Sequence, residues 1–359
     1  MKKDWDIKKL EDVCEFLDSR RKPITANKRT KGPIPYYGAT GILDYVADFL
    51  FDEELILLGE DGAKWGPGDK SAFRISGKTW VNNHAHVLKP KNMNYDWIIY
   101  YLNYSDLMKF VKGATVPKLN QENAKNISIP VPPLEEQKRI VKILDEKFAQ
   151  LETIKANAQT NLQNAKDLFQ SQLTKAFSNT SWEKKRLYEL CSRIFAGGDK
   201  PQIVSKEISE TCQIPIYANG ITDDGLYGYT NEATVFDKCL TISARGTIGF
   251  TCIRNKPFVP IVRLLVLIPK DEINISYLKY GCDTLTITNT GSSIPQLTVP
   301  MIKDYKIPLP PLSEQKRIVK ELDALSETVL QLQEIYTKQI ANCDELKQAY
   351  LQKAFEGEL

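Results

Sequence analysis

Two segments of this chain place apolar side chains at spacings that alternate between three and four residues. The first segment runs from Leu134 to Phe177 and the second from Leu312 to Phe355, and neither contains a glycine or a proline. Such spacing, sustained over several turns, is typical of long helices that pack along an apolar stripe. At ~1.5 Å per residue, each segment predicts a helix of roughly 65 Å. The stripe consists of Val141, Leu144, Phe148, Leu151, Ala158, Leu162, Ala165 and Phe169 in the first segment and of Leu322, Leu325, Val329, Leu332, Tyr336, Cys343, Leu346 and Tyr350 in the second. The candidates for partner docking or coiled-coil packing are Leu134, Val141, Leu144, Phe148, Leu151, Leu312, Val319, Leu322, Leu325 and Val329.

A single helix of this length needs a partner that covers its apolar stripe, and the chain offers two such helices. We expect them to pack on each other in antiparallel orientation, because the first leads away from the segment before it and the second leads back. A Pro-Pro pair precedes each helix, and proline is tolerated in a first helical turn. Glu135, Glu136 and Glu314 follow at the end where the helix dipole favours negative charge.

The sequence before each helix has a different pattern, with short apolar runs separated by turns rich in glycine and asparagine. Leu55–Leu58, Val81–Leu88 and Arg263–Pro269 are typical of strands, and Tyr95–Leu102 and Ser276–Tyr280 of short helices. We therefore expect an α+β protein, in which two mixed α/β domains are separated by two long antiparallel helices. The expected boundaries are 1–130 for the first domain, 131–178 for the first long helix, 179–308 for the second domain and 309–359 for the second long helix.

The two halves of the chain are copies of one unit. Ile129–Asp145 (IPVPPLEEQKRIVKILD) returns 178 residues later as Ile307–Asp323 (IPLPPLSEQKRIVKELD), with 14 of 17 positions identical. A repeat of this length is a duplicated domain, because solenoid and propeller repeats run only ~20–50 residues. The helical part of each copy is retained while the domain before it has diverged.

Composition narrows the class of protein. The 359 residues are 42% hydrophobic and 26% charged, with no apolar run near the ~18–20 residues that span a membrane. The first residues lack the apolar core of a signal peptide, so we expect a cytoplasmic protein. Seven cysteines without a Cys-x-x-Cys pair argue against a disulfide framework and a zinc ribbon. The net charge of +3 is compatible with DNA binding but does not by itself indicate it.

No complete catalytic motif is found in the sequence. Gly62–Ser71 approaches a phosphate-binding loop, but Asp69 interrupts the required Gly-Lys-Ser. Glu136-x-Lys138 resembles the end of a nuclease motif without its upstream aspartate, and solvated helix charges are the favoured interpretation. His84 and His86 would share one face of a strand, which leaves a metal site as the alternative to a polar strand surface. Methyltransferase motifs are missing, so we expect no enzyme activity, metal or cofactor in this chain.

The duplicated Pro-Pro-Leu-x-Glu-Gln-Lys-Arg-Ile-Val, each time opening a long helix, resembles the specificity subunit of type I restriction–modification systems. Gly59–Ala63 and Ser243–Gly249 also resemble the turn that target-recognition domains of this family carry. The resemblance covers the whole chain. It implies a non-catalytic DNA-reading subunit with one target-recognition domain for each half of an asymmetric bipartite sequence. The retained helices would fix the spacing and dock two methyltransferase subunits, which restriction subunits would join. Those partners, rather than this chain, would use S-adenosylmethionine, ATP and magnesium.

The resemblance makes polar and basic loop residues candidates for DNA contact, because arginine matches guanine and asparagine or glutamine matches adenine in the major groove. For any single residue, an ordinary solvated role stays open. The loops Gly113–Leu119 and Gly291–Leu297 are candidates as a group, with a turn retained only for folding as the alternative. The candidates are Arg29, Lys31, Lys64, Asn82, Asn83, His84, Lys112, Thr115, Lys118 and Asn120 in the first domain and Lys200, Gln202, Asn219, Arg245, Thr247, Arg254, Asn289, Ser292, Ser293 and Gln296 in the second.

Two other classes of function remain open at this point. One is a nuclease or methyltransferase fragment, which the missing motifs disfavour. The other is a two-headed scaffold that binds protein or glycan ligands through its two domains.

Overall fold

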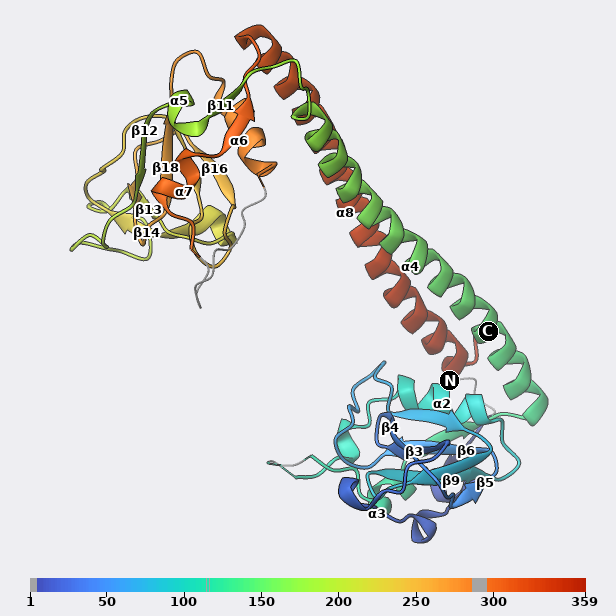
Figure 1. Cartoon of the computed structure of the whole chain (residues 1–359). Coiled ribbons are helices and arrows are strands. Elements are labelled where there is room, and N and C mark those ends of the chain that lie inside the picture. The colour runs from blue at the N-terminus through green and yellow to red at the C-terminus, as the bar shows by residue number, and fades with distance from the viewer. Residues whose placement is uncertain (1–4, 114, 116, 286–295) are drawn as a thin grey trace. The chain divides into compact units, whose positions relative to one another are not determined.

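The chain divides into two compact units in the computed structural model, which describes residues 5–113, 115, 117–285 and 296–359. Unit 1 consists of residues 1–159 and 337–359, and unit 2 of residues 160–336. Each unit combines one α/β domain with parts of two long helices, α4 (Leu134–Ala176) and α8 (Leu312–Glu356) (Figure 1). The division between the units therefore falls inside the helices, not at their first residues.

The domain of unit 1 is built on two four-stranded sheets. One has the strand order β2-β9-β6-β7, with all neighbours antiparallel, and the other has the order β4-β3-β8-β5, in which β3 and β8 run parallel. All five residues of β6 are buried, since this strand has a neighbour on each side and core on both faces. The elements are β1 (Asp6–Lys9), α1 (Leu10–Val13), β2 (Cys14–Phe16), η1 (Asp18–Arg20), η2 (Ala26–Lys28), β3 (Ile34–Gly38), β4 (Gly41–Val46), β5 (Phe51–Asp52), β6 (Leu55–Gly59), β7 (Ala72–Ile75), β8 (Lys78–Val81), β9 (Ala85–Pro90), α2 (Tyr95–Tyr104), η3 (Met108–Phe110), α3 (Gln121–Lys125) and β10 (Ser128–Val131).

The domain of unit 2 repeats this topology although its sequence has diverged. The order β12-β18-β15-β16 matches β2-β9-β6-β7, and β14-β13-β17 matches β4-β3-β8, including the parallel pair. In both domains the first strand also pairs with the last, β1 with β10 and β11 with β19. The elements are β11 (Lys184–Arg186), α5 (Leu187–Leu190), β12 (Cys191–Ala196), β13 (Ile214–Tyr217), η4 (Thr222–Gly225), β14 (Leu226–Thr230), β15 (Cys239–Ile242), β16 (Thr251–Arg254), β17 (Val259–Pro260), β18 (Leu265–Pro269), α6 (Ile275–Asp283), α7 (Val299–Lys303) and β19 (Lys306–Pro308).

One of the predicted strands is wrong, while the two long helices, the two short helices and the other two strands are found. Val81–Leu88 is not a single strand, because β8 ends at Val81 and β9 begins at Ala85. Between them the Asn82 side chain accepts a hydrogen bond from the backbone N–H of His84 (2.8 Å), which stabilises a turn. Asn82, Asn83 and His84 therefore lie in a loop, whereas His86 lies in β9.

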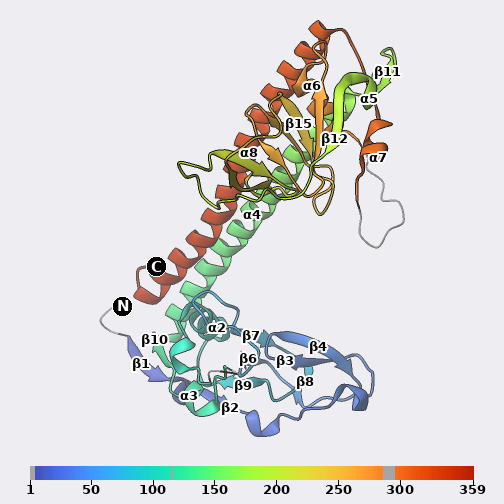
Figure 2. The same cartoon turned by 90° about the vertical axis from the view of Figure 1, so that its left-hand side faces the viewer.

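In each unit, part of α4 lies beside part of α8 and runs in the opposite direction (Figure 2). In unit 1, Lys155 of α4 forms an ion pair with Asp344 of α8 (2.6 Å). In unit 2, Leu173 near the end of α4 shares a core with Ile318 near the start of α8. Within the part of the chain that the structure describes, no helix combines the length and the apolar character needed to cross a membrane.

The residues of the predicted apolar stripe and of the docking candidates are buried or half-buried within the units, except at the first residue of each helix and at Leu346, which is 48% exposed. Leu134 and Leu312 are 36% and 37% exposed. Ile140 and Ile318, which the stripe leaves out, are buried because each also packs against an α/β domain. The buried docking candidates are Val141, Leu144, Phe148, Leu151, Val319, Leu322 and Val329, and Leu325 is half-buried.

The glutamine of the retained motif joins each long helix to its domain. Gln137 Oε1 accepts a hydrogen bond from Asn94 N (2.9 Å), and its Nε2 donates to Pro132 O (2.8 Å). Gln315 does the same with Asn274 N (2.9 Å) and Pro310 O (3.0 Å). Because both glutamines are almost fully buried, no water replaces these bonds, and this gives a structural reason for the retained glutamine.

The last turn of each long helix packs on the short helix of the domain in the same unit. Phe355 of α8 contacts the rings of Trp97 and Tyr101 on α2, with centroids 4.9 and 5.0 Å apart. Phe177, which follows α4, contacts Tyr277 on α6 at 4.8 Å. The phenylalanine of the retained Lys-Ala-Phe therefore packs the C-terminal end of α4 on the domain of unit 2 and the C-terminal end of α8 on the domain of unit 1.

Candidate functional site

Three loops of unit 1 meet at the end of β6 and the start of β9. Glu60 N donates to His84 O (2.8 Å), and Leu119 N donates to Glu60 O (2.8 Å). Lys112 and Lys118 exchange two backbone hydrogen bonds of 2.9 and 2.8 Å, which holds the ends of the third loop together. We call residues 60–64, 82–84, 112–113, 115 and 117–119 the first loop cluster. It brings together the candidates Lys64, Asn82, Asn83, His84, Lys112, Thr115 and Lys118.

A buried network of charged side chains packs against the backbone of the first loop cluster. The Arg21 guanidinium donates to Glu60 (2.5 Å) and lies 3.3 Å from an Asp18 oxygen. His86 Nδ1 contacts Asp18 (2.6 Å), while its Nε2 contacts Leu119 O (2.8 Å). Both nitrogens of this buried ring therefore face acceptors, and His86 ties the core to the third loop.

Both carboxylates of this network are ionised at neutral pH. Burial raises the pKa of Asp18, but hydrogen bonds from His86 and from Val87 N, together with nearby charges, hold the pKa below its ordinary value. Burial also raises the pKa of Glu60, and hydrogen bonds from Arg21 and Lys118 lower it by more. The resulting ion cluster fixes the backbone of Glu60 and so the direction of the loop that follows.

The metal site considered for His84 and His86 does not form, since the premise of a shared strand fails. His84 lies in the turn before β9, and its side chain contacts Asp61, whereas His86 points into the core. Among the described residues, one group of three metal-ligating side chains comes close together, formed by Asp18, Glu60 and His86. The guanidinium of Arg21 already supplies a positive charge to both of its carboxylates.

Unit 2 has an equivalent second loop cluster, formed by residues 219, 243–249, 262–263 and 296–297. Leu297 N donates to Ala244 O (2.9 Å), the counterpart of the Leu119 bond to Glu60. Asn219 links two of these loops, because its side chain accepts from Ala244 N and donates to Val262 O (both 2.7 Å). The candidates Asn219, Arg245, Thr247 and Gln296 thus come together, and Arg245 donates to Gln296 Oε1 (2.9 Å).

Some candidates have structural roles within the chain. Arg254 was expected in a loop, but it lies in β16, is buried, donates to Thr241 Oγ1 (3.1 Å) and stacks 3.5 Å above the Tyr217 ring. The expectation of an accessible loop arginine is therefore wrong. Asn120 caps α3 by accepting from Asn123 N (2.9 Å). Arg29 forms an ion pair with Asp44 (3.0 Å).

The other candidates do not join either cluster. Lys31, Lys200 and Gln202 are exposed on loops away from the contacts that define the two clusters. Asn289, Ser292 and Ser293 lie outside the described residues, as does most of the second Gly/Ser/Pro loop.

Two residues of the clusters, Asp61 and Arg263, are not among the candidates that the sequence predicts, because one is acidic and the other has no sequence signal that marks it. Asp61 lies between His84 and Lys118 in the first cluster. Arg263 is exposed in the turn before β18, at the position that His84 occupies before β9. Val262 and Arg263 have φ values of 52° and 65°, a strained conformation for residues other than glycine. The sequence does not predict this turn, because neither Val262 nor Arg263 is a glycine or an asparagine.

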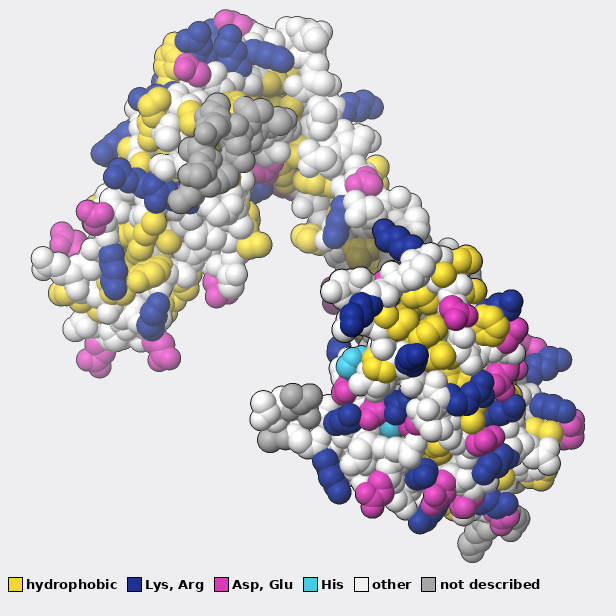
Figure 3. Space-filling view, turned by 60° about the horizontal axis from the view of Figure 1, so that its bottom comes forward, with side chains coloured by type: hydrophobic (Ala, Val, Ile, Leu, Met, Phe, Trp, Pro, Cys, Tyr) yellow, Lys and Arg dark blue, Asp and Glu magenta, His cyan; other side chains and the backbone are white. Residues whose placement is uncertain are grey.

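On the face of unit 1 that Figure 3 shows, the described charged side chains do not form one basic surface. Figure 3 shows Lys and Arg interspersed with Asp and Glu over the visible face of the α/β domain of unit 1. A ligand read by this domain is therefore met by mixed donors and acceptors as well as by positive charge.

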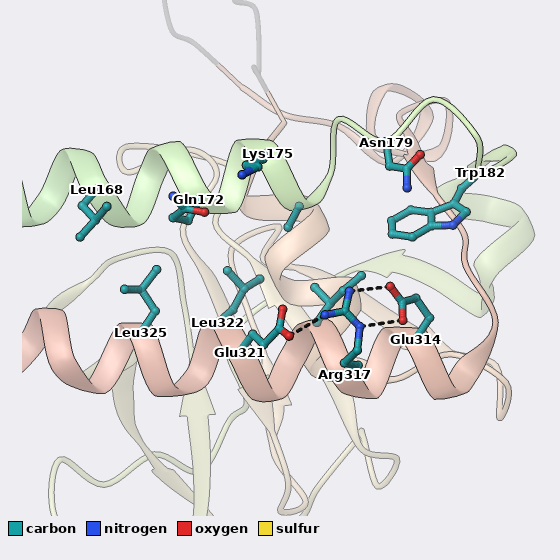
Figure 4. Close-up of a pocket in the computed structure, with 12 residues that line it drawn as sticks. Leu168, Gln172, Lys175, Asn179, Trp182, Glu314, Arg317, Glu321, Leu322 and Leu325 are labelled. Atoms are coloured by element: carbon teal, nitrogen blue, oxygen red, sulfur yellow. Dashed lines mark hydrogen bonds and ion pairs between the residues drawn. The ribbon is translucent and has the colours of Figure 1, made fainter.

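Unit 2 also has a groove of about 600 Å³ between the end of α4 and the start of α8 (Figure 4). Leu168 and Trp182 line one side, and Leu322 and Leu325 the other. Arg317 lies at its edge, held by ion pairs with Glu314 (2.7 Å) and Glu321 (2.5 Å). The groove offers an apolar floor with a fixed charged rim, which is typical of a surface that binds another protein.

The family model and the similar proteins found by comparison point to the same family. The family described as type I restriction modification DNA specificity domain matches residues 2–163 and, a second time, residues 179–341. A putative type I specificity subunit of Mycoplasma pneumoniae is 28% identical over 326 residues, which cover 88% of each chain. A putative type I restriction enzyme specificity subunit of Haemophilus influenzae is 30% identical over 342 residues, covering 88% of this chain and 86% of the relative.

Two solved structures share the fold at low sequence identity. A chain from a study of complex assembly and conformational transition in the type I R-M system has a TM-score of 0.79 at 20% identity, covering 99% of this chain and 98% of that one. The crystal structure of the HsdS subunit from Thermoanaerobacter tengcongensis has a TM-score of 0.62 at 20% identity, covering 100% of this chain and 98% of that one. The duplicated domains and long helices are thus a known architecture.

Proposed function

Because the chain belongs to the family of type I restriction–modification DNA specificity subunits, we propose that it reads a bipartite DNA sequence with one unit on each half-site. The chain itself is a non-catalytic subunit of such a system. The observation that carries the proposal is the pair of loop clusters, which share one backbone arrangement and present different side chains. Two sites with the same frame and different chemistry match two half-sites of different sequence.

The exposed lysines of the domains supply part of the contact with phosphates. Lys64 and Lys112 lie in the first cluster, and Lys31 and Lys200 on other loops. A net charge of +3 is small for a protein that binds DNA alone. Partner subunits that clamp the duplex provide the remaining phosphate contacts and leave the loop clusters to read base edges.

The partners are two methyltransferase subunits, which dock on the outer surfaces of α4 and α8. Support comes from the apolar groove of unit 2 and from Leu134 and Leu312, which are partly exposed at the helix starts. The methyltransferases bring S-adenosylmethionine, and restriction subunits that join the complex bring ATP and magnesium. The complex acts on DNA in the cytoplasm.

Docking is tested with exposed leucines that can be changed without opening a core. Leu168, in the groove, is 46% exposed, and Leu43, on β4 of unit 1, is 55% exposed. Leu168→Asp is expected to weaken co-purification with the methyltransferase at least tenfold, because a charge in an apolar contact loses its water. Leu43→Asp is the matched control and should co-purify as the wild type does. Equal co-purification of both variants would contradict docking at the groove.

Sequence reading is tested on the purified complex of this chain with its methyltransferase. It should retard duplexes that carry the recognised sequence and retard unrelated duplexes only at much higher concentration. A complex that binds all duplexes equally, or none, would contradict a role in sequence recognition.

A further inference from the structure

The two loop clusters contain equivalent positions that the backbone defines. The bond from Leu119 N to Glu60 O corresponds to the bond from Leu297 N to Ala244 O. The strand pairing agrees, because Leu58 on β6 faces β9 as Ile242 on β15 faces β18. Counting from these bonds, Asp61 is the counterpart of Arg245, and Lys118 of Gln296.

Glycines that follow confirm this correspondence. Gly62 and Gly246 have φ values of 69° and 67°, which favour glycine, and no atom lies within 4 Å of an added Cβ at either position. The chain therefore makes the same left-handed turn directly after Asp61 and after Arg245. The two side chains leave the same turn of the same fold.

In both units the two equivalent side chains pair with each other. Lys118 Nζ lies 2.9 Å from Glu60 Oε1 and 3.7 Å from Asp61 Oδ2, and Arg245 Nη2 donates to Gln296 Oε1 at 2.9 Å. The charge is inverted at the first position, where the acceptor Asp61 corresponds to the donor Arg245, and at the second position the cation Lys118 corresponds to the neutral Gln296. His84 also contacts Asp61, and its counterpart Arg263 adds a further positive charge to the second cluster.

We propose that this position determines base specificity in both half-sites, with Asp61 accepting a hydrogen bond from the amino group of a cytosine and Arg245 donating to the O6 and N7 atoms of a guanine. The inference rests on the proposed function and adds the residues and the base class. Aspartate accepts well from cytosine N4, and the arginine fork matches the two guanine acceptors. His84, with Lys118 nearby, holds Asp61 in place before DNA binds, and Gln296 holds Arg245.

An acidic residue is unfavourable in a loop that faces DNA, because its charge repels the phosphates, unless it has a specific role there. Asp61 is tied to two cationic or donor side chains, and its side chain is still 21% exposed. This accessible acceptor surface can be used by a base amino group and by no phosphate oxygen. The same loop position in unit 2 carries no acidic group, so the fold itself does not require one.

The test transplants the first pair onto the second unit. Arg245→Asp combined with Gln296→Lys is expressed with the methyltransferase, and the methylated sequences of the host are read. One position of the second half-site should lose its guanine requirement and come to prefer cytosine, while the first half-site stays unchanged. Arg193→Gln is the matched control, because Arg193 is an exposed arginine of unit 2 on β12, outside the cluster, and it should leave the motif unchanged.

If the double variant no longer methylates DNA, a second measurement on a single variant still tests the inference. Arg245→Gln in the purified complex is titrated against duplexes that differ from the wild-type sequence by single base pairs. Affinity for the cognate duplex should fall tenfold or more, and the preference should disappear at one base pair only. An unchanged preference at every base pair, or an equal loss for all duplexes from a normally folded variant, would overturn the inference. If the wild-type complex yields no bipartite motif at all, the proposed function fails instead.

Discussion

Replacing Gln137 with leucine tests how each long helix is joined to its domain. The change keeps the side-chain volume similar but removes both polar atoms from a site that is 1% exposed. Asn94 N then loses its acceptor (2.9 Å) and Pro132 O its donor (2.8 Å), and neither gains access to water. Each buried backbone group left without a partner costs ~1–3 kcal/mol, so unit 1 should lose about 4 kcal/mol of unfolding free energy.

The assay is thermal unfolding of the full chain, followed by hydrogen exchange resolved by peptide. For a unit of this size a loss of 1 kcal/mol lowers the midpoint by ~2–4 °C, so Gln137→Leu should lower the midpoint of unit 1 by roughly 8–16 °C. Exchange should increase in α2 and in the first turns of α4. Gln159→Leu is the matched control, because Gln159 is an exposed glutamine on the same helix, and it should change stability by less than ~0.5 kcal/mol.

The equivalent glutamine of unit 2 allows the same test in the other unit. Gln315→Leu should destabilise unit 2 by a similar amount and raise exchange in α6, because Gln315 makes the same two bonds. If Gln137→Leu behaved like the Gln159 control, the retained glutamine would not be a structural clamp. Its retention in both copies would then need another cause, such as contact with a partner.

Phe355→Ala removes the ring that packs on Trp97 and should lower the unfolding free energy of unit 1 by ~3–5 kcal/mol in chemical denaturation, whereas an unchanged midpoint would mean that the end of α8 does not anchor the domain. Glu60 has a lowered pKa when folded, so its ion pair with Arg21 stabilises the chain above the ordinary pKa of 4.5 and is lost as pH falls through the folded value. The difference in thermal midpoint between the wild type and Glu60→Gln should therefore be largest near pH 7 and shrink toward pH 3; a constant difference would contradict this linkage. Deleting one heptad from α4 should alter the gap between half-sites or abolish binding, as read by methylation sequencing, and altered base preference within a half-site would contradict a spacer role.

The regular parts of the fold follow from the sequence because they depend on local periodicity. Alternating spacings of three and four predict α4 and α8 almost to the residue, since nothing within them breaks a helix. The duplication then predicts a second domain like the first, and the strand orders agree. Val81–Leu88 fails because the side chain of Asn82 makes a turn that a pattern of apolar residues does not reveal.

The site could be predicted only in part, since it depends on contacts between residues far apart in the chain. His84 and Lys118 were chosen as polar loop residues, and the structure brings them together around Asp61. The network of Arg21 and Glu60 joins residues 39 positions apart and has no local signature. Arg254 looks like a loop donor in the sequence, but it is buried against Tyr217.

The central claim is that the two units read two different half-sites. Methylation-aware sequencing of a host that expresses this chain with its methyltransferase tests it most directly, with and without replacement of residues 1–130 by the corresponding block of a related chain. We expect one asymmetric bipartite motif, of which the replacement changes a single half-site and leaves the gap and the other half-site as they were. A single contiguous motif, or a replacement that changes both half-sites together, would contradict it.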